Sequence, residues 1–243
     1  MKIPLKAEIP MGKTIAIMQP TYLPWSGYFE LMDRCDVFVF LDTVQFEKCS
    51  WHKRNKIKTA SGETWLTIPV KRNGFQQKLT DTEIDHAHQF SKKHLKTIEY
   101  AYKKAPFYDQ YMPTLSMILE KNHQSLTDLT IELCLWLKSE LGITTDITYS
   151  SKLPCSGSKV DLVVSICKQV GAARYYSPKG AAGYIAENNI FLDNNIILEY
   201  QDYQPVPYQQ LHGDFIPYLS VIDLLMNEGE KSLSIIRAGQ KIV

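Results

Sequence analysis

Hydrophobic residues near the start of the chain are spaced first as a strand, then as a helix, then as a strand. Residues 13–18 (KTIAIM) form a short apolar run typical of a buried strand. Residues 26–35 carry apolar side chains at helical spacing, with Ser26 placed to cap the helix. The run at 36–42 (DVFVFLD) is nearly continuous, as in a strand buried on both faces. This order predicts a βαβ unit, and therefore two parallel strands joined by a right-handed crossover.

The middle of the chain predicts a hairpin followed by helices. Residues 54–59 and 64–70 have the composition of two strands, and Ser61 and Gly62 between them favour a tight turn. The polar segment 71–80 predicts a loop. Apolar residues then recur at helical spacing, and Gly142 is placed to end the last of these helices. Three helices are therefore expected, at residues 90–102, 108–119 and 126–141.

The last third returns to an alternation of strands and helices, which is typical of a parallel sheet. The expected strands are 146–149, 173–177 and 196–200, and the expected helices are 160–170, 181–188 and 219–227. We therefore predict an α/β fold, with a mostly parallel central sheet flanked by helices, a β-hairpin and a helical middle insertion at about 85–141. No linker divides the sequence, so we expect a single domain spanning 1–243.

Composition and charge exclude several classes of protein. The formal net charge of +1 provides no general field that would attract nucleic acid or an acidic membrane. The apolar run at 15–18 is too short for a signal peptide, and no run is long enough to insert into a membrane. The five cysteines are odd in number and irregularly spaced, which favours reduced thiols and a cytoplasmic location.

Polar and aromatic residues gather where the first strand is expected to meet the first helix. The segment contains Gln19, Tyr22 and Trp25, with prolines on both sides of Tyr22. In open parallel sheets, ligands bind outside the carboxyl ends of the strands, and a helix N-terminus favours an anion. We therefore predict that these three residues bind substrate, the alternative being that they only pack a tight loop.

A second group of polar residues follows the next strand. Asp42 is a candidate base, while its alternative role is a loop hydrogen bond. Arg54 suits a phosphate because its guanidinium forms a two-pronged donor. Gln45, Trp51 and Asn55 complete this predicted binding group. Because the two strands are expected to be neighbours, both groups should lie at one edge of the sheet.

Three further stretches contribute candidates. Lys179 and Tyr184 occupy a glycine-rich turn between a strand and a helix, where small residues allow close approach to a ligand. Gln209 and Asp223 belong to a proline-rich aromatic loop and the helix after it, which Ser220 is placed to cap. His212, in the same loop, is the best-placed histidine for acid–base chemistry, although a structural role is an open alternative.

The other histidines supply weaker candidates. His94 is expected to share a helix face with apolar residues, so its role could be catalytic or structural. His86, His88 and Asp85 have a spacing that matches neither an HExxH motif nor a zinc finger. We therefore predict no metal site.

Taken together, the motifs resemble the WbqC-like protein family over nearly the whole chain. The segments that carry the resemblance are QPTYLPWSGYF, DTVQFEKCSWHKRN, WLTIPV, HLKTIEYAYKKAP, YYSPKGAAGY and FIPYLSVIDLLMNEG. The chain departs from the family pattern at His52, where an amide or another polar residue is usual. It also departs at Pro178, because Ser-Gly is common where this chain has Ser177-Pro178. His52 is therefore a poor catalytic candidate.

The resemblance implies a role in the biosynthesis of bacterial surface polysaccharides such as the O-antigen of lipopolysaccharide. The expected function is an acyl- or aminoacyltransferase acting on a nucleotide-linked amino sugar, which requires an acyl or aminoacyl donor as second substrate. A first alternative is a nucleotidyltransferase-like enzyme, although the HxGH motif is absent. A second alternative is a non-catalytic partner that binds the nucleotide sugar. The sequence leaves the oligomeric state open, a homo-oligomer included.

Overall fold

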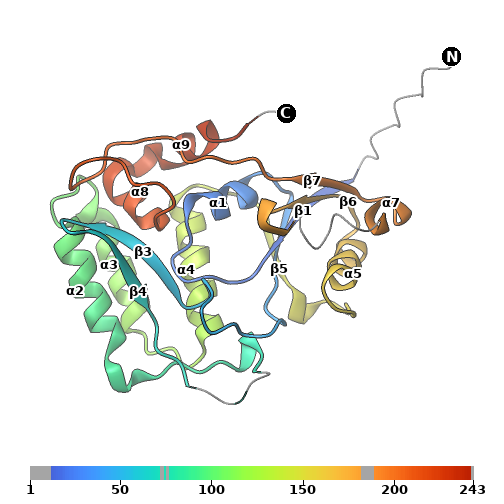
Figure 1. Cartoon of the computed structure of the whole chain (residues 1–243), viewed down its shortest axis with the longest axis horizontal. Coiled ribbons are helices and arrows are strands. Elements are labelled where there is room, and N and C mark those ends of the chain that lie inside the picture. The colour runs from blue at the N-terminus through green and yellow to red at the C-terminus, as the bar shows by residue number, and fades with distance from the viewer. Residues whose placement is uncertain (1–11, 72–73, 75–76, 182–188, 242–243) are drawn as a thin grey trace.

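The computed structural model describes residues 12–71, 74, 77–181 and 189–241. Within these residues, five parallel strands form a central sheet in the order β5-β2-β1-β6-β7 (Figure 1). The strands are β1 (Lys13–Met18), β2 (Val37–Phe40), β5 (Asp146–Tyr149), β6 (Ala172–Ser177) and β7 (Ile197–Tyr200). The predicted α/β class with a parallel sheet is confirmed.

Helices cover both faces of this sheet (Figure 1). The helices are α1 (Ser26–Asp33), α2 (Phe90–Tyr102), α3 (Tyr108–Glu120), α4 (Leu126–Glu140), α5 (Val160–Val170), α7 (Ile190–Asp193), α8 (Val221–Glu228) and α9 (Ser232–Ala238). Because side chains alternate along a strand, Ile15 and Ile17 of β1 pack with α5 and α7. Ala16 and Phe38 face the other way and join the larger core formed with α1, α4 and α8.

A separate two-stranded sheet lies outside the central one (Figure 1). Strands β3 (Arg54–Thr59) and β4 (Gly62–Thr67) pair antiparallel, and this confirms the predicted hairpin. The turn requires Gly62, whose φ of 99° is readily adopted only by glycine. One face of the hairpin carries Ile57 and Leu66 into the larger core, next to α2 and α8.

The order of the strands creates a point where the connections change direction. From β1 the chain passes through α1 to β2 on one side, whereas β6 pairs with the other side of β1. Loops at the carboxyl ends of β1 and β6 therefore diverge and leave a crevice between them, which is where open parallel sheets bind ligands.

Several predicted details differ from the structure. Ser26 is the first residue of α1 rather than its cap: the N-cap is Trp25, which makes no side-chain capping bond, and the helix ends at Asp33 rather than Cys35. Helices α7 and α9 were not predicted, because each is too short to show a periodic pattern. The helix predicted at 181–188 lies outside the described residues except for Ala181, which ends a short 3-10 helix.

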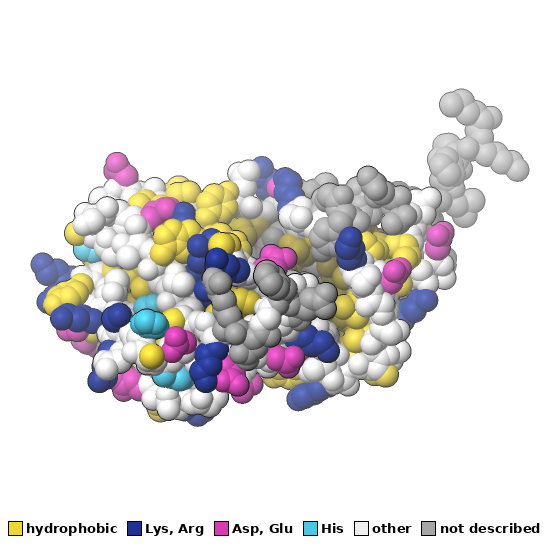
Figure 2. Space-filling view, turned by 60° about the horizontal axis from the view of Figure 1, so that its bottom comes forward, with side chains coloured by type: hydrophobic (Ala, Val, Ile, Leu, Met, Phe, Trp, Pro, Cys, Tyr) yellow, Lys and Arg dark blue, Asp and Glu magenta, His cyan; other side chains and the backbone are white. Residues whose placement is uncertain are grey.

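Neither charge dominates the face of the molecule drawn in Figure 2. On the face drawn in Figure 2, basic and acidic side chains are interspersed, in keeping with the net charge of +1. Across the described residues, no helix combines the length and apolar character needed to cross a membrane.

Candidate functional site

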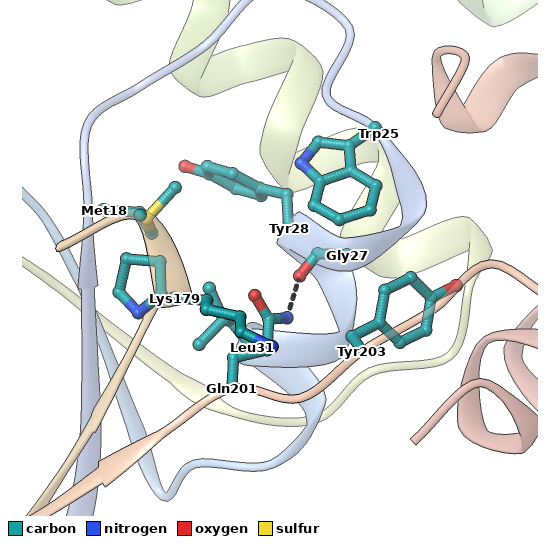
Figure 3. Close-up of a pocket in the computed structure, with 10 residues that line it drawn as sticks. Met18, Trp25, Gly27, Tyr28, Leu31, Lys179, Gln201 and Tyr203 are labelled. Atoms are coloured by element: carbon teal, nitrogen blue, oxygen red, sulfur yellow. Dashed lines mark hydrogen bonds between the residues drawn. The ribbon is translucent and has the colours of Figure 1, made fainter. Parts of the chain in front are cut away.

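A cleft opens at the carboxyl end of β1, at the crevice created by the strand order. It consists of two adjoining cavities of about 260 and 350 Å³, which share Met18, Trp25 and Tyr28. The first cavity extends toward the residues that follow β6 and β7, including Lys179 and Gln201 (Figure 3). The second extends toward the hairpin. The cleft therefore occupies the place that the strand topology predicts for a ligand.

Trp25 stands in the middle of the cleft between two tyrosines. Its ring centroid is 5.6 Å from that of Tyr203 and 5.4 Å from that of Tyr218, and both pairs are tilted. Gly27 lies directly beneath the indole, because a Cβ atom on Gly27 would stand only 2.2 Å from the ring. The main chain at Trp25 pairs with Ser220 just before α8, and Val221 donates to the carbonyl oxygen of Pro24 at 2.8 Å. The indole is thus held from several directions.

A buried polar network fixes the floor of the first cavity. The Gln201 amide donates to the carbonyl oxygen of Gly27 at 2.7 Å (Figure 3) and also to the Glu30 carboxylate. The Tyr176 hydroxyl donates to the other oxygen of Glu30 at 2.9 Å. Burial raises the pKa of Glu30, while the donors from Gln201 and Tyr176 act in the opposite direction. The network ties the first turn of α1 to the ends of β6 and β7.

Among the described residues, Lys179 is the only lysine on the walls of the two cavities, and it lies at the rim. Its ammonium group lies 3.4 Å from Asp202, and three quarters of its side chain is exposed. An exposed pair of this kind is weak, so the ammonium group is available to an anionic ligand. The N-terminus of α1 adds a partial positive charge to the same cavity.

The second cavity is mostly apolar and adjoins the hairpin. Thr21, Pro24, Trp51 and Asn55 line it together with Tyr218. The Asn55 amide donates to the carbonyl oxygen of Leu23 at 2.7 Å, which supports the loop between β1 and α1. The buried hydroxyl of Thr21 has no hydrogen-bond partner in the described part of the chain.

The structure places only part of the predicted binding set in the cleft. Trp25, Trp51, Asn55 and Lys179 line it. Two others lie behind its wall: the Gln19 side chain bonds to the His52 ring at 2.7 Å, and the Tyr22 hydroxyl bonds to the His94 ring at 2.8 Å. Tyr184 lies outside the described residues.

The remaining predicted binding residues are found elsewhere. Gln45 lines a different cavity of about 590 Å³. Arg54 stacks on Trp65 of the hairpin. Gln209 is exposed, and its backbone donates to Glu228. Asp223 is fully buried and accepts hydrogen bonds from two tyrosines, so it has no surface for a ligand.

None of the three predicted catalytic residues lines the cleft. The Asp42 carboxylate accepts hydrogen bonds from the Ser150 and Ser151 hydroxyls at 2.7 and 2.6 Å. The His212 ring is bonded to the carbonyl oxygen of Ala101 on α2 at 2.7 Å. His94 is buried behind the loop that precedes α1. Each therefore has the structural role that the sequence left open, and catalysis by any of them stays a prediction.

Sequence reasoning missed several residues of the cleft. These are Met18, Tyr28, Gln201, Tyr203 and Tyr218. Gln201 and Tyr203 follow the end of β7 directly, so the rule that selected the residues after β1 and β2 would also have selected them. For a metal, no group of three or more His, Cys, Asp or Glu side chains with suitable geometry occurs in the ranges that the structure describes.

Two buried histidines behind the cleft predict a loss of stability in acid. Burial lowers the pKa of both His52 and His94 to about 4, from 6.5. Because the pKa is lower in the folded state than in the unfolded state, each neutral histidine contributes fully to stability above pH 6.5. This contribution is lost as the pH falls toward 4. Each histidine should lower the free energy of unfolding by roughly 2–3 kcal/mol at pH 4.5 relative to pH 7.

The measurement is urea unfolding at pH 7 and pH 4.5 for the wild type and for His52→Gln and His94→Gln. Each variant should lose less stability than the wild type between the two pH values. The difference between variant and wild type reports the effect of the histidine alone. Carboxyl groups with a raised pKa, such as Glu30, change the pH dependence of stability in the opposite direction, but they do so equally in both proteins. An identical pH dependence in variant and wild type would show that the histidines are protonated without cost.

Comparison with known proteins gives one family and one relative. The model of the WbqC-like protein family matches residues 19–235. The uncharacterized protein Rv1507c of Mycobacterium tuberculosis (strain ATCC 25618 / H37Rv) is 35% identical over 228 residues, which cover 93% of this chain and 98% of the relative. No solved structure matches the chain. The matched span includes β2 to β7 and all the residues of the cleft except Met18.

Proposed function

Because the chain belongs to the WbqC-like protein family, we propose that it binds a nucleotide-linked amino sugar in the cleft and transfers an acyl or aminoacyl group to the sugar amine. The reaction would serve the biosynthesis of bacterial surface polysaccharides. The observation that carries this proposal is the position of an aromatic cleft at the point where the strand order reverses.

The composition of the cleft suits such a ligand. Tryptophan and tyrosine rings stack on the faces of sugars and bases, and Trp25, Tyr203 and Tyr218 present such rings side by side. The first cavity offers the Lys179 ammonium group and the N-terminus of α1, which both favour an anionic group of one of the two substrates. Two adjoining cavities also match a transferase, which must hold a donor and an acceptor in contact.

The transfer itself needs a deprotonated amine next to the acyl carbonyl carbon. The amine nitrogen attacks that carbon, its proton passes to a base, and the bond to the donor's leaving group breaks. Holding the two substrates in one cleft replaces an encounter in solution by a reaction between neighbours, which is a large part of the catalysis in such reactions. The rings around Trp25 would supply this positioning.

The test is a mass measurement on a panel of nucleotide-linked amino sugars, each incubated with the protein and with different acyl and aminoacyl donors. The expected result is a mass gain equal to one acyl group on one of the sugars, which is lost when Trp25 is replaced by alanine. If the wild type gives no gain with any pair of substrates, the transferase activity is contradicted.

A specific observation favours one rival, a protein that holds the nucleotide sugar without changing it. Asp42, His94 and His212 are all engaged in structural hydrogen bonds away from the cleft. The same experiment separates the two functions when binding is measured beside it. Tight binding without mass gain, retained in Asp42→Asn and His212→Ala, would identify the binding protein.

A further inference from the structure

Two exposed indoles lie side by side where the cleft meets the hairpin. Trp51 is 50% exposed and Trp65 is 43% exposed, and their ring centroids are 5.4 Å apart with an angle of 35° between the planes. Trp51 also lines the second cavity of the cleft, so the pair is continuous with it. Exposed aromatic rings do not gain the free energy that burial would provide. An exposed pair of rings beside a cavity is therefore typical of a surface that binds a ligand or another protein.

The hairpin register places two cations on the same face as Trp65. Lys56 stands directly opposite Trp65 in the antiparallel pair, and Arg54 lies at the diagonal position. The Arg54 guanidinium is 4.5 Å and the Lys56 ammonium group 5.2 Å from the centroid of the ring. Asn55 and Ile57, which alternate with them, point into the protein. We call Trp51, Trp65, Arg54 and Lys56 the indole platform.

The two cations of the indole platform differ in their partners. Lys56 forms an ion pair with Glu63 at 2.6 Å. Arg54 donates one hydrogen bond to the carbonyl oxygen of Cys49 at 2.8 Å, and within the described ranges no carboxylate lies within 4.0 Å of it. The other N–H groups of the guanidinium remain for an anion. A stacked arginine without an acidic partner, beside an exposed indole, presents both parts of a site for a planar ring that bears phosphate.

We infer that the indole platform binds the nucleoside diphosphate part of a substrate, with the base on the indoles and the phosphate at Arg54. The inference rests on the proposed function, and it assigns the base to the hairpin side of the cleft and the rest of the ligand to the interior around Trp25. A neutral sugar chain would also stack on the indoles, but it would leave the Arg54 charge without a partner. A base that carries phosphate is present both in a nucleotide sugar and in a nucleotide-bearing acyl donor.

The experiment measures the binding of uridine diphosphate and adenosine diphosphate to the full chain by calorimetry. The two probes distinguish the sources, because the first represents a nucleotide sugar and the second an adenine-bearing donor. Trp65→Ala should weaken the binding of the better probe about tenfold or more, since stacking of one base on one aromatic ring has that magnitude. Arg54→Gln should weaken it as well and should reduce its dependence on salt.

Tyr100→Ala provides the matched control. Tyr100 is an exposed aromatic residue on α2, and it too has lysines near its ring, Lys96 and Lys103, at 5.7 and 5.9 Å. Tyr100 is not among the described residues that line the two cavities, so its loss should leave nucleotide binding unchanged. Urea unfolding of each variant verifies the fold, which the exposed positions of Trp65 and Tyr100 should preserve.

The outcomes separate this inference from the proposed function. If the wild type binds and acylates a nucleotide sugar but Trp65→Ala and Arg54→Gln bind the nucleotide as tightly as the wild type, the platform is wrong and the function stands. If both variants lose nucleotide affinity while no sugar is acylated, the platform is supported and the transferase activity fails. If the wild type binds neither probe, the platform is overturned.

Discussion

Replacing Gly27 with alanine is expected to weaken ligand binding about tenfold or more and to destabilise the protein by about 1–3 kcal/mol. The added Cβ atom would lie 2.2 Å from the Trp25 ring, so the indole must leave its place between Tyr203 and Tyr218. Alanine would favour helix α1 by only about 0.5–1 kcal/mol relative to glycine, which does not offset the overlap. Calorimetric titration and urea unfolding measure the two effects.

A double variant shows whether displacement of the Trp25 indole causes the losses expected for Gly27→Ala. In a Trp25→Ala background there is no ring to displace, so adding Gly27→Ala should cost no further stability or affinity. Gly180→Ala controls for the stability measurement, because a Cβ atom at Gly180 would meet no atom of the described residues within 4 Å. Full additivity of the Gly27 and Trp25 changes would contradict the proposed contact.

Replacing Asp223 with alanine is expected to destabilise the protein by about 3–5 kcal/mol, the largest effect on stability that we predict. The carboxylate is fully buried and accepts from the Tyr102 and Tyr208 hydroxyls, both at 2.7 Å. Burial raises its pKa, whereas the two tyrosines and the nearby Lys58 charge favour its ionised form. Without it, the two hydroxyl groups would lose their acceptor, and the buried Lys58 charge would lose a nearby negative charge.

Tyr208→Phe offers a graded comparison, because it removes the hydrogen bond to Asp223 and the one accepted from Gln210, but leaves the carboxylate with Tyr102. It should cost about 1–2 kcal/mol, clearly less than Asp223→Ala. Urea unfolding at pH 7 measures both. The same network secures the aromatic loop, since Lys58 also donates to the carbonyl oxygens of Gly213 and Asp214. Equal and small effects of the two variants would show that the network contributes little to stability.

The sheet was predictable because its strands have a strong pattern. Residues 37–40 are all apolar and all buried, as a strand covered on both faces requires. The alternation of strands and helices then predicted parallel pairing, and the strand-end rule pointed to the edge of the sheet where the cleft lies. These inferences need only local spacing, which a single sequence contains.

The choice of side chains within the site was not predictable from the sequence in the same way. Asp42 is bonded to Ser150, 108 residues away, and His212 is bonded to Ala101, 111 residues away. Such partners determine whether a polar group is free for a ligand, and they depend on tertiary contacts between distant segments. Trp25 and Lys179 do line the cleft, because loop residues next to strand ends stay near it whatever their neighbours, and their role in binding stays a prediction.

The most direct test of this account is a crystal structure of the protein with a nucleotide-linked amino sugar. We predict density for the ligand between the ends of β1 and β6, in contact with Met18, Trp25 and Tyr28. A ligand bound elsewhere on the molecule, with this cleft empty, would contradict the assignment of the site and the function derived from it.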